Sequence, residues 1–108
     1  MRKSLLILGV LALALAQLIA SPENAAIIAA TKTYVAANSG MTKINVAVEK
    51  VEGDFARVKV SPQDAGTTDP AWVFLKKKNG KWTGLTLGTA FDPEDYQQLG
   101  IPKSLRVN

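Results

Sequence analysis

Apolar side chains between residues 22 and 37 recur at intervals of three and four, which is the spacing of one helix face. The stripe consists of Ile27, Ile28, Thr31, Tyr34 and Val35. Ser21 offers an N-cap oxygen, and Pro22 stands at the first helical position, where proline is favoured. Gly40 suits the left-handed conformation that ends many helices. The sequence therefore predicts an amphipathic helix from Pro22 to about Ala37.

From residue 44 the pattern changes to an alternation of apolar and polar side chains, which predicts strands buried on one side. Segments 44–49 and 55–60 show this alternation, and two further strands are indicated by the apolar runs 71–75 and 82–87, which flank the turn-forming residues 78–81. Gly53 lies in a turn between the first two, and the polar segment 61–70 separates the second from the third. The Asn79-Gly80 pair between the last two is the strongest short-range signal of a β-hairpin. We expect four consecutive antiparallel strands.

A second, short helix is indicated near the C-terminus. Asp92 suits its N-cap, Pro93 its first position, and Gly100 its end, while Pro102 prevents continuation. The fold class is therefore α+β. One N-terminal amphipathic helix packs on a four-stranded antiparallel meander, and a short C-terminal helix follows.

The last hairpin has two possible registers. A two-residue turn pairs Lys77 with Trp82 and Phe74 with Leu85, so that Phe74 shares a face with Leu85 and Leu87 while Trp82 lies on the other face. Regular alternation keeps Leu85 and Leu87 on one face in either register.

The second register has a three-residue loop with a bulge at Gly80, and it pairs Lys76 with Trp82. In this register Trp72, Phe74 and Trp82 gather on a single face. Both registers place large apolar side chains on both faces of the sheet, although only one main helix is available to cover them.

Two arrangements would resolve this surplus of apolar surface. In the first, residues 89–108 fold back over the second face and bury it with Phe91, Tyr96, Leu99, Ile101 and Leu105. In the second, the face stays partly open as an aromatic groove, which would be a binding site. The sequence leaves both arrangements open.

The first twenty residues have the pattern of an export signal. Arg2 and Lys3 precede an unbroken apolar run from Leu5 to Ala16, which is shorter than the roughly 20 residues that a membrane-spanning helix needs. Cleavage after Ala16 or after Ala20 satisfies the preference for small residues, and an uncleaved anchor is the alternative. We predict that residues 1–20 are a signal peptide and that residues 21–108 form one small domain.

The segment from Leu18 to Ser21 resembles the lipobox of bacterial lipoproteins, in which the last position is an acylated Cys. Ser21 has no thiol for a thioether bond, so we expect no stable membrane anchor after cleavage. The expected location is secreted or periplasmic.

Composition narrows the picture further. The chain carries 13 Lys and Arg against nine Asp and Glu, and Arg2 and Lys3 would leave with the leader, so the charge of the domain is only about +2. This weak bias gives no reason to expect nucleic acid as a partner. Because the chain has no Cys, the exported domain must be held together by its apolar core.

The chain also has no His. Without His and Cys it lacks the commonest general base, the thiolate nucleophile and the usual zinc ligands. Asp92, Glu94 and Asp95 form the one dense group of carboxylates, and helix capping accounts for Asp92 and Glu94. We therefore expect no catalytic residue, no metal site and no cofactor, and we predict that the protein is not an enzyme.

The stretch DPAWVFLKKKNGKWTGLTLGTAFDPEDYQQLGIPKSL over residues 69–105 resembles the C-terminal half of small exported bacterial proteins and lipoproteins of unassigned function. The sequences LGT at 87–89 and LGIP at 99–102 are its most specific parts, and GDFARV at 53–58 fits the same pattern. The resemblance implies a cystatin-like, or nuclear-transport-factor-like, α+β domain and no particular activity. In the proteins that it resembles, a bulky apolar residue is usual at the position of Gly84. The glycine of this chain would therefore leave a notch beside Trp82.

These observations favour a non-catalytic extracytoplasmic binding domain that uses an aromatic sheet face, with a small apolar ligand or a protein as its partner. The alternative is a protein-interaction module, such as a secreted hydrolase inhibitor or an accessory of envelope assembly. The candidate binding residues are Trp72, Phe74, Trp82, Lys76 and Lys77. The two lysines belong to a basic hairpin tip, whose other explanation is solubility and protection of the sheet edge.

Overall fold

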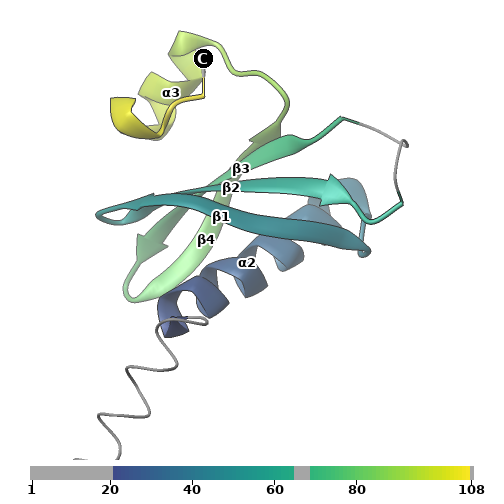
Figure 1. Cartoon of the computed structure of the whole chain (residues 1–108). Coiled ribbons are helices and arrows are strands. Elements are labelled where there is room, and N and C mark those ends of the chain that lie inside the picture. The colour runs from purple at the N-terminus through teal and green to yellow at the C-terminus, as the bar shows by residue number, and fades with distance from the viewer. Residues whose placement is uncertain (1–20, 65–68, 108) are drawn as a thin grey trace, which may run out of the picture.

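The structure, a computed structural model, describes residues 21–64 and 69–107. The predicted signal peptide and its cleavage sites after Ala16 and Ala20 lie outside the described residues. The order of elements is α2, β1, β2, β3, β4, α3 and a final 3₁₀ turn, η1 (Figure 1). The predicted α+β fold class is confirmed, with a helix on a four-stranded antiparallel sheet and a short helix near the C-terminus.

Helix α2 covers Pro22–Ser39, so it begins at the predicted residue and extends two residues beyond Ala37, up to the predicted cap at Gly40. The Ser21 side chain accepts a hydrogen bond from the Asn24 backbone amide at 3.0 Å. Gly40 has a φ of 76° and donates from its own amide to the Ala36 carbonyl oxygen at 2.9 Å, which closes the last turn.

The sheet is a meander in the order β1-β2-β3-β4, formed by β1 (Ile44–Glu52), β2 (Phe55–Pro62), β3 (Ala71–Lys78) and β4 (Lys81–Gly88). Each strand pairs antiparallel with the next. Strands β1 and β4 are therefore the two edges. The backbone of α2 approaches these edge strands more closely than the central ones.

The β3–β4 hairpin begins in the first of the two predicted registers and departs from it beyond Gly84. Its turn has the two residues Asn79 and Gly80, with φ values of 53° and 77°, so both adopt the positive φ of a type I′ turn. Lys77 pairs with Trp82, as the two-residue register requires. The pairing then shifts, because Leu75 is opposite Gly84 while its neighbour Phe74 is opposite Thr86. The extra residue in this bulge is Leu85.

The bulge separates the two leucines of β4. Leu87 packs in the cluster on the α2 side of the sheet, whereas Leu85 packs in the cluster on the opposite side. The prediction that Leu85 and Leu87 share a face is therefore wrong, because an extra residue reverses the alternation of side chains beyond it.

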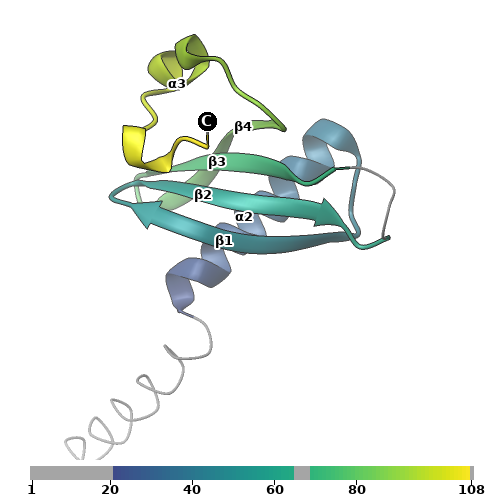
Figure 2. The ribbon, with the colours of Figure 1, turned by 45° about the horizontal axis from the view of Figure 1, so that its top comes forward.

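The sheet thus has an apolar cluster on each face. The cluster under α2 contains Ile27 and Val35 of the helix and the buried residues of the strands, namely Ile44, Ala56, Val58, Val60, Val73, Leu75 and Trp82. The other cluster lies beneath the segment that contains α3 (Pro93–Leu99) and η1 (Lys103–Leu105). Figure 2 shows this segment on one side of the sheet and α2 on the other.

Candidate functional site

The second face of the sheet is covered by the C-terminal segment, the first of the two arrangements that the sequence left open. Phe74 at its centre has no exposed surface. Its ring meets Phe91 and Tyr96 edge to face, with centroids 5.2 and 5.7 Å apart. Ile101 and Leu105 are also buried in this cluster, and Leu99 is half-buried at its margin. Phe74 is therefore a core residue of the described fold.

Trp72 lies half-buried at the margin of the same cluster, and its polar edge is engaged within the protein. The indole nitrogen donates to Glu49 Oε1 at 2.9 Å. Arg57 Nε donates to the same oxygen at 3.0 Å, and Arg57 Nη1 donates to the Leu105 carbonyl oxygen at 2.8 Å. These bonds tie three strands to the C-terminal segment, so the contacts of Trp72 are explained by the fold.

Trp82 lies on the opposite face, in the cluster beneath α2, and is only 5% exposed. The Lys77 ammonium stands 5.9 Å from the centroid of its ring and 3.0 Å from a carboxylate oxygen of Glu23. Lys77 thereby joins the hairpin tip to the first turn of α2. The neighbouring Lys76 instead stands 5.2 Å from the ring centroid of Phe55.

The structure therefore does not bring the five candidate binding residues together. The grouping of Trp72, Phe74 and Trp82 on one face is wrong, because the two-residue turn pairs Trp82 with Lys77 and so places Trp82 on the side of α2. The notch expected at Gly84 is also filled, since the ring of Tyr34 lies against that position.

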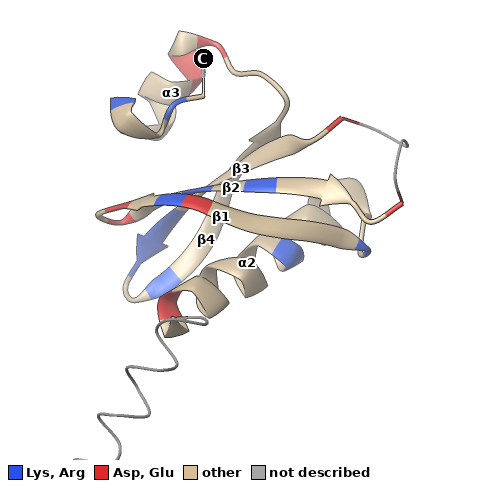
Figure 3. Ribbon diagram, in the orientation of Figure 1, with Lys and Arg blue, Asp and Glu red and all other residues tan. Residues whose placement is uncertain are grey.

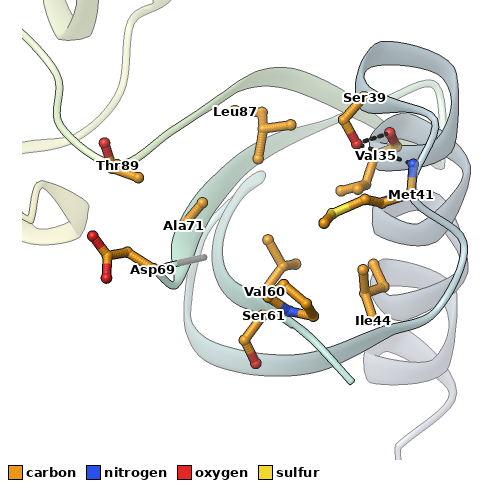
Figure 4. A pocket seen from close by; sticks show the side chains of 11 residues that line it. Val35, Ser39, Met41, Ile44, Val60, Ser61, Asp69, Ala71, Leu87 and Thr89 are labelled. Atoms are coloured by element: carbon orange, nitrogen blue, oxygen red, sulfur yellow. Dashed lines mark hydrogen bonds between the residues drawn. The ribbon is translucent and has the colours of Figure 1, made fainter. Parts of the chain in front are cut away.

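A different apolar site opens at the end of the core near the C-terminus of α2. Figure 4 shows the side chains around it, which come from α2, from the segment that follows α2, from β1 to β4, and from positions just before β3 and just after β4. Its volume is about 210 Å³. Its apolar lining consists of Val35, Met41, Ile44, Val60, Pro62, Ala71 and Leu87. We call this site the terminal pocket.

Polar groups stand at the rim of the terminal pocket. Asp69 and Thr89 lie on the side of the pocket away from α2 (Figure 4). The Ser39 hydroxyl makes its hydrogen bonds with the backbone at the C-terminal end of α2: it donates to the Val35 carbonyl oxygen at 2.8 Å and accepts from the Met41 amide at 3.3 Å. The pocket thus combines an apolar interior with a carboxylate and a hydroxyl at one edge.

The sequence analysis did not identify this pocket. The period-two pattern predicts Leu87 on the face opposite Trp82, because no signal in the sequence marks the bulge at Leu85, whereas the structure places Leu87 and Trp82 in the same cluster. Met41 does carry a signal, because it is a large apolar residue directly after the helix-ending Gly40, and it is 37% exposed.

The acidic group near the C-terminus has a structural role. The Asp92 backbone amide donates to Asp95 Oδ2 at 3.2 Å, and the Asp95 amide in turn bonds back to the backbone of Asp92 at 3.0 Å. Asp95, rather than Glu94, is therefore the residue that completes the cap of α3. Over residues 21–64 and 69–107, no three acidic side chains are grouped so that they could hold a metal ion.

In the part of the chain that the structure describes, no helix is both long enough and apolar enough to cross a membrane. In comparisons with known proteins, no family model, no curated protein and no solved structure matches this chain.

Proposed function

We propose that the protein is an exported, non-catalytic binding domain that takes a small apolar ligand in the terminal pocket. The observation that carries this proposal is an open apolar site on a fold whose two sheet faces are otherwise covered. The extracytoplasmic part of the proposal is supported by the pattern of residues 1–20, which is typical of an export signal.

The size of the pocket limits the ligand. An apolar cavity of about 150 Å³ accepts a benzene molecule, whereas sites for drug-sized ligands occupy about 300–1,000 Å³. A volume of about 210 Å³ therefore suits a single ring or a short alkyl chain. We expect the apolar group to lie among the apolar lining residues, such as Met41 and Leu87, and a polar end to remain at the rim near Asp69 and Thr89.

A series of straight-chain alcohols from butanol to decanol, titrated by calorimetry, tests this function. Each buried methylene contributes about 0.8 kcal/mol, so affinity should rise about fourfold per carbon until the chain fills the pocket. Beyond that length the affinity should level off. A steady rise over the whole series would show partitioning onto a surface and would contradict the proposal.

A variant that fills the pocket provides the specific control. Ala71→Leu places a larger side chain in the pocket lining and should abolish saturable binding. Ala47→Leu makes the same change at an exposed position of β1 outside the pocket and should leave binding unchanged. Equal affinity in the two variants, with both folded by circular dichroism, would rule out this pocket as the site.

A further inference from the structure

The outer edge of β4 lies beside a groove that is separate from the terminal pocket. The groove has a volume of about 650 Å³ and runs between one face of α2 and the first half of β4. On the α2 side it is lined mainly by small residues, namely Ala26, Ala29, Ala30, Thr33 and Ala37, with Tyr34 among them. On the β4 side it is lined by residues 80–84. We call it the edge groove.

The backbone of β4 presents hydrogen-bonding groups to this groove. Lys78 and Lys81 close the two-residue turn, and such a closing pair exchanges both of its hydrogen bonds. Along β4 the backbone amide and carbonyl of one residue point toward β3, and those of the next residue point away from it. Because those of Lys81 point toward β3, those of Trp82 and Gly84 point away from it. Because β4 is the last strand of the sheet, no described strand pairs with them.

The two edges of the sheet differ in how they are protected. Edge strand β1 carries a bulge between Val48 and Lys50 together with the charged side chains of Glu49 and Lys50. Bulges and charges of this kind block the addition of another strand. Strand β4 carries one charged side chain, that of Lys81 at its start beside the turn; residues 82–88 carry none, and its bulge comes only after Gly84. The first half of β4 is therefore the edge that is open to pairing.

The charge at one end of the edge groove indicates the polarity of its occupant. Figure 3 shows lysines at the free end of the β3–β4 hairpin. Lys77 is paired with Glu23, but the exposed Lys78 and Lys81 form no ion pair with any described residue. An antiparallel strand added to β4 would place its C-terminal end beside these two lysines, because its direction is opposite to that of β4.

We propose that the edge groove binds an extended peptide segment of a partner protein, which adds antiparallel to β4 as a fifth strand. The segment has an acidic C-terminal end that meets Lys78 and Lys81. Every second side chain of the segment is apolar and lies against the small residues of α2 that line the groove, since the side chains of a strand alternate between its two faces. The bulge after Gly84 limits the paired region to about four residues, or about 14 Å of strand.

The test uses the protein purified after expression of the full chain and a fluorescein-labelled peptide, Ser-Val-Thr-Val-Asp-Glu, in a polarisation assay. The peptide should bind saturably, and replacing its last two residues by Lys-Lys should weaken binding at least tenfold. Raising the salt to about 0.5 M should also weaken binding, because the lysine contacts are exposed and screened. Failure of the acidic peptide to bind at 1 mM, or equal binding of the two peptides, would overturn the proposal.

Paired variants locate the site. Ala29→Leu fills part of the groove and should weaken binding about tenfold. This is roughly the loss expected when one apolar side chain of the peptide is no longer buried. Ala25→Leu, also exposed on α2 but outside the groove, should change affinity less than twofold. Alanine and leucine both favour helix, so both variants should keep α2 intact.

A charge reversal tests the polarity of the segment. Lys81→Glu should weaken binding at least fivefold, and Lys43→Glu, an exposed lysine before β1 and outside the groove, should not. Equal effects within either pair of variants would exclude the edge groove. Sedimentation that shows a dimer abolished by Ala29→Leu would assign the groove to a second copy of the chain and contradict the peptide proposal.

Discussion

The ring of Tyr34 on α2 lies where a side chain on Gly84 of β4 would be placed. A Cβ atom on Gly84 would fall against Cγ and Cδ1 of that ring and 2.8 Å from the Tyr34 Cβ. The helix therefore approaches the edge strand through contact between a tyrosine and a bare backbone. Glycine inside a strand weakens it, and here close approach of another element explains its presence.

Replacing Gly84 with alanine should destabilise the protein by about 1–3 kcal/mol, because the added methyl group forces Tyr34 or the strand to shift. Urea denaturation measures the change. In a Tyr34→Ala background the same replacement should cost clearly less, since the obstructing ring is absent, and the two changes should be non-additive. If the free-energy changes of the two replacements are additive, the Tyr34 ring is not what excludes a side chain at position 84. Thr83→Ala, at an exposed neighbouring position, should stay within about 0.5 kcal/mol of the original protein.

Loss of the C-terminal cover should be costly. Leu105 has no exposed surface and packs in the cluster with Phe74. Leu105→Ala should lower the free energy of unfolding by about 2–5 kcal/mol, because it removes buried methyl groups and leaves a cavity. Leu99→Ala, at a half-buried position of the same segment, should cost less. Equal and small losses in both variants, measured by thermal unfolding, would show that the segment is not an integral part of the core.

The Glu49 carboxylate should contribute modestly to stability through its bonds with Trp72 and Arg57. It accepts from both side chains at 2.9 and 3.0 Å, but it remains partly exposed. Glu49→Gln should therefore cost about 1 kcal/mol or less, and the loss should shrink at high salt. Glu52→Gln, whose carboxylate is 3.8 Å from Lys50, should have no measurable effect. The NMR shift of the Trp72 indole N–H should move in the first variant only.

The type I′ turn should make Gly80 sensitive to substitution. Its φ of 77° is strained for a residue with a side chain, although no atom would obstruct a Cβ there. Gly80→Ala should cost about 1–2 kcal/mol from backbone strain alone. Lys81→Ala, next in the chain and exposed, should be close to neutral. A neutral Gly80→Ala in denaturant titration would argue against the two-residue turn.

Local signals in the sequence predicted the elements well, since caps, turns and periodicity are properties of neighbouring residues. Ser21, Pro22 and Gly40 bound α2, and Asn79-Gly80 forms the turn of the last hairpin. The candidate site was predicted poorly because it depended on which face each residue of β4 occupies. Period two assigns faces correctly only along an unbroken ladder.

What the sequence by itself determined is the helix, the four strands, their antiparallel order and the need to cover a second apolar face. The tertiary structure alone decided where the bulge falls, and so which side chains meet. The extra residue Leu85 turns Leu87 toward α2 and into the terminal pocket, while Trp82 and Phe74 stay on opposite faces. The physical reason is that a bulge is fixed by packing on both faces at once, with Tyr34 against Gly84 on one and Leu85 beside the C-terminal segment on the other. Neither contact is encoded in the local pattern of β4.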